Sequence, residues 1–272
     1  MRLFMFLSTF FFFSVSYTQQ PSHSQITIIG TTHNGNNYIN GDSLLNILYK
    51  INPAIIFDEI IFSVEAPLYV RLAKSLGLKK NTIEDYATKK YVKKYPNTLL
   101  VGMDMKFENR NKYAKEVQRF NENLKSKNNL IFASSTTPDS IKQIILQYIT
   151  PKNYSIRALN NSDLYTLNQL SLTDSIRLMY KILNTRLISA INNYPQYSDI
   201  VEMSNEYLAT WNKRNNVMAK NILNQIQTVS TISPVVILCG LYHKFYLEDL
   251  LKPQQDKYNF KLYNYWELFK EQ

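Results

Sequence analysis

Two histidines stand in the same local setting near opposite ends of the chain. His33 follows the apolar run Ile26–Ile29 in Ile-Thr-Ile-Ile-Gly-Thr-Thr-His, and His243 ends Val-Val-Ile-Leu-Cys-Gly-Leu-Tyr-His. In each case an apolar run ends at a glycine, and a histidine follows three residues later. Such a run is typical of a buried β-strand. The third histidine, His23, lies in a polar segment. Because open α/β sheets bind ligands beyond the carboxyl ends of their strands, we expect His33 and His243 at one binding edge.

Carboxylates follow two further expected strands. Asp58 and Glu59 come directly after the run Ala54–Phe57, and Asp104 comes shortly after Thr98–Val101. Successive strand residues point to opposite faces, so only one of Asp58 and Glu59 can face a shared site, and the sequence leaves open which one. We expect Asp104 to cap a helix or to face water, and we keep it as a secondary candidate.

One arginine interrupts the apolar stripe of a long helical pattern. Within Tyr197–Val229, Arg214 lies three residues after Trp211 and four before Met218, on the inward side. A buried guanidinium needs a partner because an isolated buried charge is very costly. Arg214 should therefore face a carboxylate, an anionic ligand or a developing negative charge, or else form a structural ion pair. Asn215 beside it could serve the same site.

These residue types suit metal-dependent hydrolysis. Two histidines and a carboxylate are a common ligand set for a catalytic divalent metal with an open position for water. His33, His243 and Glu59 are thus candidate ligands for Mn, Co, Zn or Fe, with Glu59 as ligand or general base. Arg214 would orient substrate or stabilise an oxyanion. The same histidines could instead ligate haem iron, act as acid and base without a metal, or be buried and hydrogen-bonded without catalysis.

Composition favours an ordinary globular domain. The chain has 272 residues, of which 45% are hydrophobic, so it can bury a sizeable core. Its net charge of +10 comes mostly from dispersed lysines, and the densest group, Lys89–Lys94, is typical of a solvated helix face. Since no nucleic-acid-binding motif accompanies this charge, we expect no nucleic-acid partner. The single cysteine, Cys239, lies in an apolar run and is expected to be a core thiol.

Residues 1–18 are expected to be a signal peptide. Arg2 precedes the Phe-rich apolar stretch Leu3–Val15, which has the length of a signal-peptide core and is too short to span a bilayer comfortably. The mature chain would then begin near Gln19 and be exported to the periplasm or the medium. Membrane contact is expected only if this segment is not cleaved.

The order of the expected elements predicts one α/β domain over residues 19–272. Two βαβ-type halves would form a mixed, largely parallel sheet, with a helical insertion at about 105–230 between them. The first half has helices at Ser43–Lys50, capped by Asp42, at Ala66–Leu76 and at Thr82–Lys94. A helix also opens at Pro138 and runs through Tyr148 within the insertion. The second half has the strand that begins at Val235, a helix at Lys244–Leu251 and a strand at Phe260–Tyr263.

Four of these pieces, in this order, resemble the TraB/Tiki/GumN group of the wider clan of erythromycin-esterase-like and ChaN-like proteins. They are Gly30-Thr31-Thr32-His33, the strand ending at Glu59, Arg214–Ala219 and Gly240–His243. The resemblance implies two related α/β halves with a helical insert, and a polar site made by the two histidines, Glu59 and Arg214. Tiki members are described as metal-dependent proteases, erythromycin esterases as hydrolases, and ChaN as a haem-binding protein. We therefore expect an exported metal-dependent hydrolase of a peptide or a small-molecule amide or ester. The alternative is a non-catalytic protein that binds haem or a small ligand.

Overall fold

A parallel sheet forms the centre of the fold. The structure, a computed structural model, describes residues 23–59, 82–107, 110–228 and 234–269. Within this part of the chain, five strands pair in parallel in the order β3-β2-β4-β1-β5. The strands are β1 (Ser24–Thr31), β2 (Ile55–Asp58), β3 (Leu99–Gly102), β4 (Val235–Gly240) and β5 (Phe260–Tyr263). The predicted α/β fold is confirmed.

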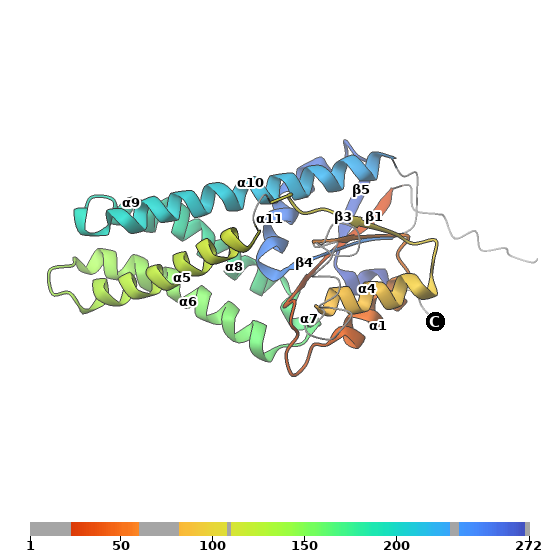
Figure 1. The fold of residues 1–272 in the computed structure, drawn as a ribbon, viewed down its shortest axis with the longest axis horizontal. Coiled ribbons are helices and arrows are strands. Elements are labelled where there is room, and N and C mark those ends of the chain that lie inside the picture. The colour runs from red at the N-terminus through yellow and green to blue at the C-terminus, as the bar shows by residue number, and fades with distance from the viewer. Residues whose placement is uncertain (1–22, 60–81, 108–109, 229–233, 270–272) are drawn as a thin grey trace, which may run out of the picture.

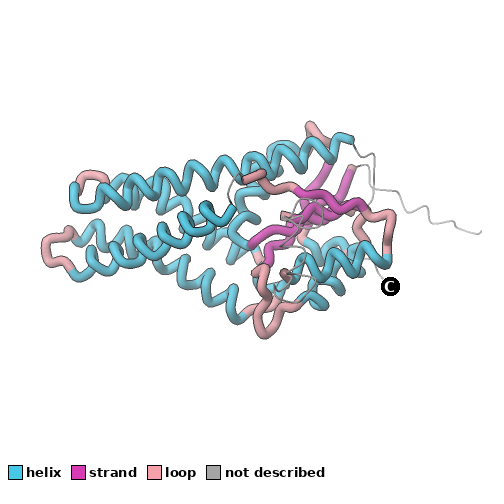
Figure 2. The backbone as a smooth tube through the Cα atoms, viewed as in Figure 1, coloured by secondary structure: helices cyan, strands magenta, loops and turns pink. Residues whose placement is uncertain are grey.

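Helices cover the sheet and extend away from it. The sheet carries α1 (Gly41–Ile51), α4 (Ile83–Lys94) and α11 (Leu241–Leu251). The predicted helical insertion contains α5 (Arg110–Ala133), α6 (Asp139–Asn161), α7 (Leu164–Leu167), α8 (Leu170–Ile182), the π-helical turn η1 (Leu183–Leu187), α9 (Ile188–Ile191) and α10 (Ser198–Thr228). Short 3₁₀ turns are η2 (Pro195–Tyr197), η3 (Lys252–Gln254) and η4 (Tyr265–Leu268). Figures 1 and 2 show the strands at one end of the molecule and α5, α6, α8 and α9 extending from it as a helical arm, with α10 running back over the sheet.

The two halves of the chain share one sheet. Strand β4, from the second half, lies between β1 and β2 of the first half. Its register with β1 pairs Gly30 with Cys239 and Thr31 with Gly240. The two strands that carry the Gly-x-x-His motifs are therefore direct neighbours, and their parallel direction places both motifs at the same edge of the sheet.

Alternate strand residues pack on opposite faces, as the pleat requires. On β4, Ile237 and Cys239 belong to a buried cluster with Met218 of α10, whereas Leu238 packs in the cluster that contains Leu48 of α1. Both faces of β4 are thus covered, which explains its continuous apolar sequence. Cys239 is the buried free thiol that the sequence predicted.

Several expected boundaries were wrong. The N-cap of α1 is Asn40 rather than Asp42, because Asn40 and Ser43 bond reciprocally in a capping box. Helix α6 does not end near Tyr148 but continues through Pro151. Helix α11 begins directly after β4, so His243 lies in the first turn of a helix rather than in a loop.

Two expectations fall on residues that the structure does not describe. The signal peptide at 1–18 and the helix expected at 66–76 lie outside the described ranges, so both stay predictions. Among the helices that are described, none combines the length and the apolar character needed to cross a membrane.

Candidate functional site

The predicted residues meet around Glu59, one position beyond β2, at the edge where the arm joins the sheet. Glu59 Oε1 accepts a hydrogen bond from Arg214 Nη2 at 2.5 Å, and Oε2 accepts one from the Gly240 N–H at 2.7 Å. His33 Nε2 lies 3.5 Å from Oε2, and His243 Nε2 lies 3.7 Å from Oε1. Four residues from three separate parts of the chain therefore surround one buried carboxylate.

The other two carboxylates have different roles. Asp58 is buried at the end of β2 and contributes a negative charge that helps to raise the pKa of His33. Asp104 accepts two hydrogen bonds from Arg214, from Nε at 2.7 Å and from Nη2 at 2.8 Å. The expectation that Asp104 caps a helix or faces water was therefore wrong. Burial opposes the charge of Arg214, but the bonds to Asp104 and the charge of Glu59 raise its pKa above the ordinary value.

Arg214 occupies the inward face of α10, as predicted. Its side chain is buried, whereas Lys213 and Lys220 on the same helix are exposed. The rings of Phe107 and Tyr113 lie 5.5 and 6.0 Å from the guanidinium carbon, measured to the ring centroids. Because Nε and Nη2 bind the two carboxylates, Nη1 is the nitrogen of Arg214 that has no carboxylate partner among the described residues, and the Tyr113 hydroxyl also interacts with this guanidinium.

His33 is held by Glu84, a residue that the sequence did not indicate. Its Nδ1 donates to Glu84 Oε1 at 2.9 Å, and the Thr31 hydroxyl donates to the same oxygen. The Ile83 N–H donates to the His33 carbonyl at 2.8 Å, which ties the left-handed turn at His33 (φ 54°) to the start of α4. Burial opposes charge on His33, but the bond to Glu84 and the charge of Glu59 outweigh it and raise its pKa to about 9. His33 is therefore protonated at neutral pH.

His243, in contrast to His33, is held as a neutral imidazole. Its Nδ1 lies 2.8 Å from Asn215 Oδ1, while Asn215 Nδ2 donates to the Trp211 carbonyl. This arrangement puts the proton of the neutral ring on Nδ1 and leaves a lone pair on Nε2. The Trp211 indole stacks on the imidazole with centroids 4.2 Å apart and planes 17° apart. Burial and the charge of Arg214 outweigh the charge of Glu59 and lower the pKa of His243 to about 3.

Glu59 stays ionised although it is buried. Burial would raise its pKa, but the imidazoles of His243 and His33, the Arg214 guanidinium and the Gly240 N–H lower it to about 2. An ionised buried carboxylate with four polar neighbours is costly to assemble for packing alone. Such perturbed groups concentrate at functional sites.

Sequence reasoning missed Glu84 and Trp211 for different reasons. Glu84 lies in the first turn of α4, where acidic residues are common because they complement the helix dipole, so nothing marked it as a partner of His33. Trp211 was assigned to the apolar stripe of α10, which is where it lies. Only its stack on His243 gives it a place in the site.

The donor set fits a divalent metal in chemical type. Both imidazoles have Nδ1 bound by an oxygen, from Glu84 or Asn215, and direct Nε2 at one carboxylate. Metal-bound histidines commonly have such an outer partner. As the side chains lie, no three His, Cys, Asp or Glu residues in the described ranges are grouped closely enough to hold a metal ion. Metal binding would have to release the proton from His33.

Comparisons of the chain with protein-family models, with curated proteins and with solved structures find no match. The resemblance to the TraB/Tiki/GumN group therefore stays a prediction.

Proposed function

We propose that the chain is a hydrolase of amide or ester bonds in a peptide or small-molecule substrate, acting at His33, Glu59, Arg214 and His243. One observation supports this most strongly: two imidazoles with opposite protonation states face the same buried carboxylate. Pairs of titratable groups whose surroundings push their pKa values apart supply a proton donor and a proton acceptor at one place.

Each group has a role in this proposal. His243 Nε2 accepts the proton of the attacking water, and His33 donates a proton to the leaving group. Glu59 aligns both rings through its two oxygens. Arg214 Nη1 stabilises the negative charge that develops on the carbonyl oxygen, while Asp104 holds the guanidinium in place through two bonds.

A second form of the proposal replaces this acid–base pair with a divalent metal, Mn, Co, Zn or Fe, which His33, His243 and Glu59 would hold after His33 has released its proton. When bound, such an ion would polarise the scissile carbonyl and provide a nucleophilic water near neutral pH. Glu84 and Asn215 would keep the imidazoles oriented by accepting from their Nδ1 atoms.

Metal content and hydrolysis, measured together, test this proposal. Mass spectrometry would give the metal content of purified chain, and a panel of nitrophenyl esters and fluorogenic peptides would be assayed with each metal supplied. We expect His33→Ala and His243→Ala to lower hydrolysis by about 100-fold or more. His23→Ala is the matched control, because His23 contacts the Tyr263 hydroxyl at 2.9 Å and takes no part in the site.

The outcomes separate the alternatives. Activity that persists after chelation assigns the reaction to the acid–base pair alone, whereas activity lost on chelation and regained with one ion identifies the metal. If the wild-type chain hydrolyses no ester or amide under any of these conditions, the hydrolase proposal fails. A Soret band on adding haem, absent in the His33→Ala/His243→Ala variant, would then support the haem-binding alternative.

A further inference from the structure

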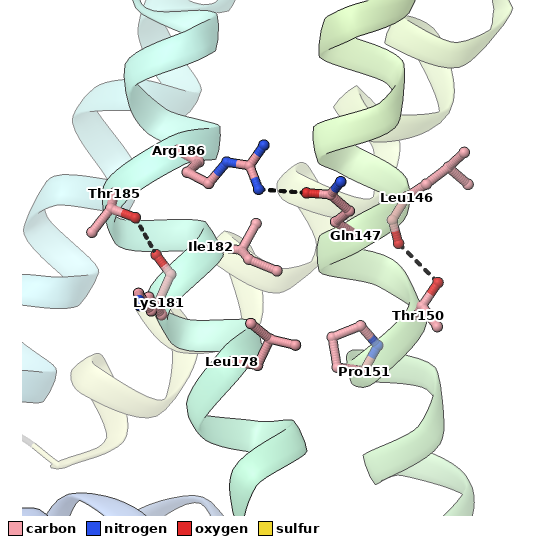
Figure 3. Close-up of a pocket in the computed structure, with 9 residues that line it drawn as sticks. All are labelled: Leu146, Gln147, Thr150, Pro151, Leu178, Lys181, Ile182, Thr185 and Arg186. Atoms are coloured by element: carbon pink, nitrogen blue, oxygen red, sulfur yellow. Dashed lines mark hydrogen bonds between the residues drawn. The ribbon is translucent and has the colours of Figure 1, made fainter.

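An open groove lies along the junction of α6 with α8 and η1 in the helical arm, and it shares no residue with the histidine site. Its volume is about 640 Å³, within the range of small-molecule sites. Figure 3 shows Pro151 and Leu146 on one wall, and Leu178 and Ile182 on the other. Leu146 is 41% exposed and Leu178 is 50% exposed. In Figure 3 Leu178 and Ile182 point toward Pro151 across the groove, whereas the Leu146 side chain points away from Leu178. A half-exposed leucine beside these apolar side chains is a surface suited to a ligand.

Arg186 supplies a cationic group at one end of the groove. There Arg186 Nη1 donates to Gln147 Oε1 at 2.6 Å and bridges the two walls (Figure 3). Lys181 also lines the groove. No carboxylate among the described residues pairs with Arg186 or Lys181. The hydroxyls of Thr150 and Thr185 donate to carbonyls of their own helices, so the cations and Gln147 supply the groove's polar side-chain groups.

Both walls depart from regular α-helix at the groove. Pro151 lies inside α6 and has no N–H to donate to the Gln147 carbonyl. On the other wall α8 passes into the π-helical turn η1, which contains Arg186. Such turns are rare and frequently occur at functional sites. The π-helical turn thus places Arg186 at the end of the groove, beyond Leu178 and Ile182.

The charge of the arm favours an anionic ligand. From residue 110 to residue 197 the chain has twelve Lys and Arg residues and five Asp and Glu residues, which accounts for most of its net charge of +10. A positive field attracts anions and opposes the approach of a second, equally charged arm. A small anion with an apolar body therefore suits the groove better than a second copy of this chain.

We propose that the groove binds a long-chain carboxylate, a free fatty acid. Its carboxylate would pair with Arg186, and its alkyl chain would lie along Ile182 and between Leu178 and Pro151. The guanidinium keeps N–H donors beyond the one given to Gln147, and its planar shape matches a carboxylate bidentately. Each methylene that enters the groove should tighten binding by about fourfold.

Calorimetric titration of the full chain with dodecanoate, below its micelle concentration, tests this proposal. We expect one saturable site that binds octanoate at least about tenfold more weakly. Leu178→Glu places a negative charge on the apolar wall of the groove, where it would repel the carboxylate of the ligand. Arg186→Gln removes the positive partner of that carboxylate. Each should weaken dodecanoate binding about tenfold or more.

Matched controls lie on the same two helices. Leu170→Glu changes a 68% exposed leucine of α8 outside the groove, and Arg157→Gln changes an exposed arginine of α6. Neither should alter the dodecanoate affinity. Leu146→Glu repeats the test from the opposite wall, and thermal melts by circular dichroism verify that each variant is folded.

Three results would overturn the proposal. The first is no dodecanoate binding, or binding unchanged by Leu178→Glu and Leu146→Glu. The second is an affinity that Arg186→Gln leaves intact, since the groove would then recognise only an apolar chain. The third is a dodecanoate affinity that Leu170→Glu or Arg157→Gln weakens as much as the groove variants do. Binding would then depend on general surface charge and exposed apolar area.

Discussion

Gly240 lies so close to His33 that no side chain can stand between them. A Cβ atom at position 240 would lie 2.7 Å from His33 Nε2 and 3.4 Å from Glu59 Oε2. The parallel pairing of β1 and β4 produces this approach. The glycine of one Gly-x-x-His motif is therefore required by the histidine of the other, and by the carboxylate between them.

Gly240→Ala should consequently damage the site more than the fold. We expect about 1–3 kcal/mol of destabilisation from overpacking, together with loss of hydrolysis per folded molecule. Gly30→Ala is the comparison, because a Cβ there would meet the Leu241 side chain at 2.9 Å rather than His33. Urea unfolding and activity, measured on both variants, check this. Equal activity in the two variants would contradict it.

The pair formed by Arg214 and Asp104 should be strongly coupled. Removing one partner of a buried pair leaves an uncompensated charge, at a cost of about 3–5 kcal/mol. Arg214→Met removes the guanidinium from both Asp104 and Glu59 and should destabilise by about that amount. Asp104→Ala should cost less, because Arg214 keeps Glu59 as a partner, and the double variant should cost less than the sum of the two. Urea unfolding of the four proteins gives the coupling. Asp42→Ala, at an exposed pair with Lys90, is the control and should change the free energy of unfolding little. Additive effects of the Arg214 and Asp104 substitutions would argue against a shared site.

Asn215 and Asn216 offer a test within one helix. Each donates Nδ2 to the carbonyl four residues earlier at 2.8 Å, but only Asn215 also binds His243. Asn215→Ala should lower metal affinity or activity by about 10–100-fold, because the tautomer of His243 is no longer fixed. Asn216→Ala should leave both unchanged. Titration calorimetry and kinetics on the two variants measure the difference, and similar losses in both would refute the role of Asn215.

The two histidines should give metal-free protein a stability maximum near pH 6.5. As pH rises from 6.5 to about 9, folded His33 keeps a proton that the unfolded chain releases, so stability falls. As pH drops from 6.5 to about 3, the unfolded chain protonates His243 while the folded chain does not, so stability again falls. Urea unfolding across this range should show both slopes. His33→Ala should remove the alkaline slope alone, and His243→Ala should remove the contribution of His243 to the acid slope; unchanged slopes would show that other groups dominate.

Glu84 should control the protonation of His33 without touching the substrate. Glu84→Gln removes the charge beside Nδ1, so the pKa of His33 should fall, as followed by NMR of the imidazole protons. Thr82→Ala is the control. It removes the N-cap of α4, whose hydroxyl accepts from the Asp85 N–H at 3.1 Å, and should cost about 1 kcal/mol while leaving that pKa in place. If the pKa of His33 changes in Thr82→Ala but not in Glu84→Gln, then the position of α4, and not the charge of Glu84, controls the protonation of His33.

The sequence by itself determined the elements and the two motifs. Apolar runs ending in glycine marked β1 and β4, and the period of α10 placed Arg214 on its inner face, because strand and helix periodicity are local properties of the chain. The same local patterns correctly predicted the α/β class and the helical insertion between the halves.

Only the tertiary structure decided which groups meet. The choice of Glu59 over Asp58 depends on β4 lying beside β2, and the role of Asp104 depends on how α10 crosses the sheet. Glu84 lies 51 residues from His33, and no local pattern encodes that contact. Charge, protonation and hydrogen bonding at a buried site are set by neighbours distant in sequence, and they become defined only when the strands have taken their order.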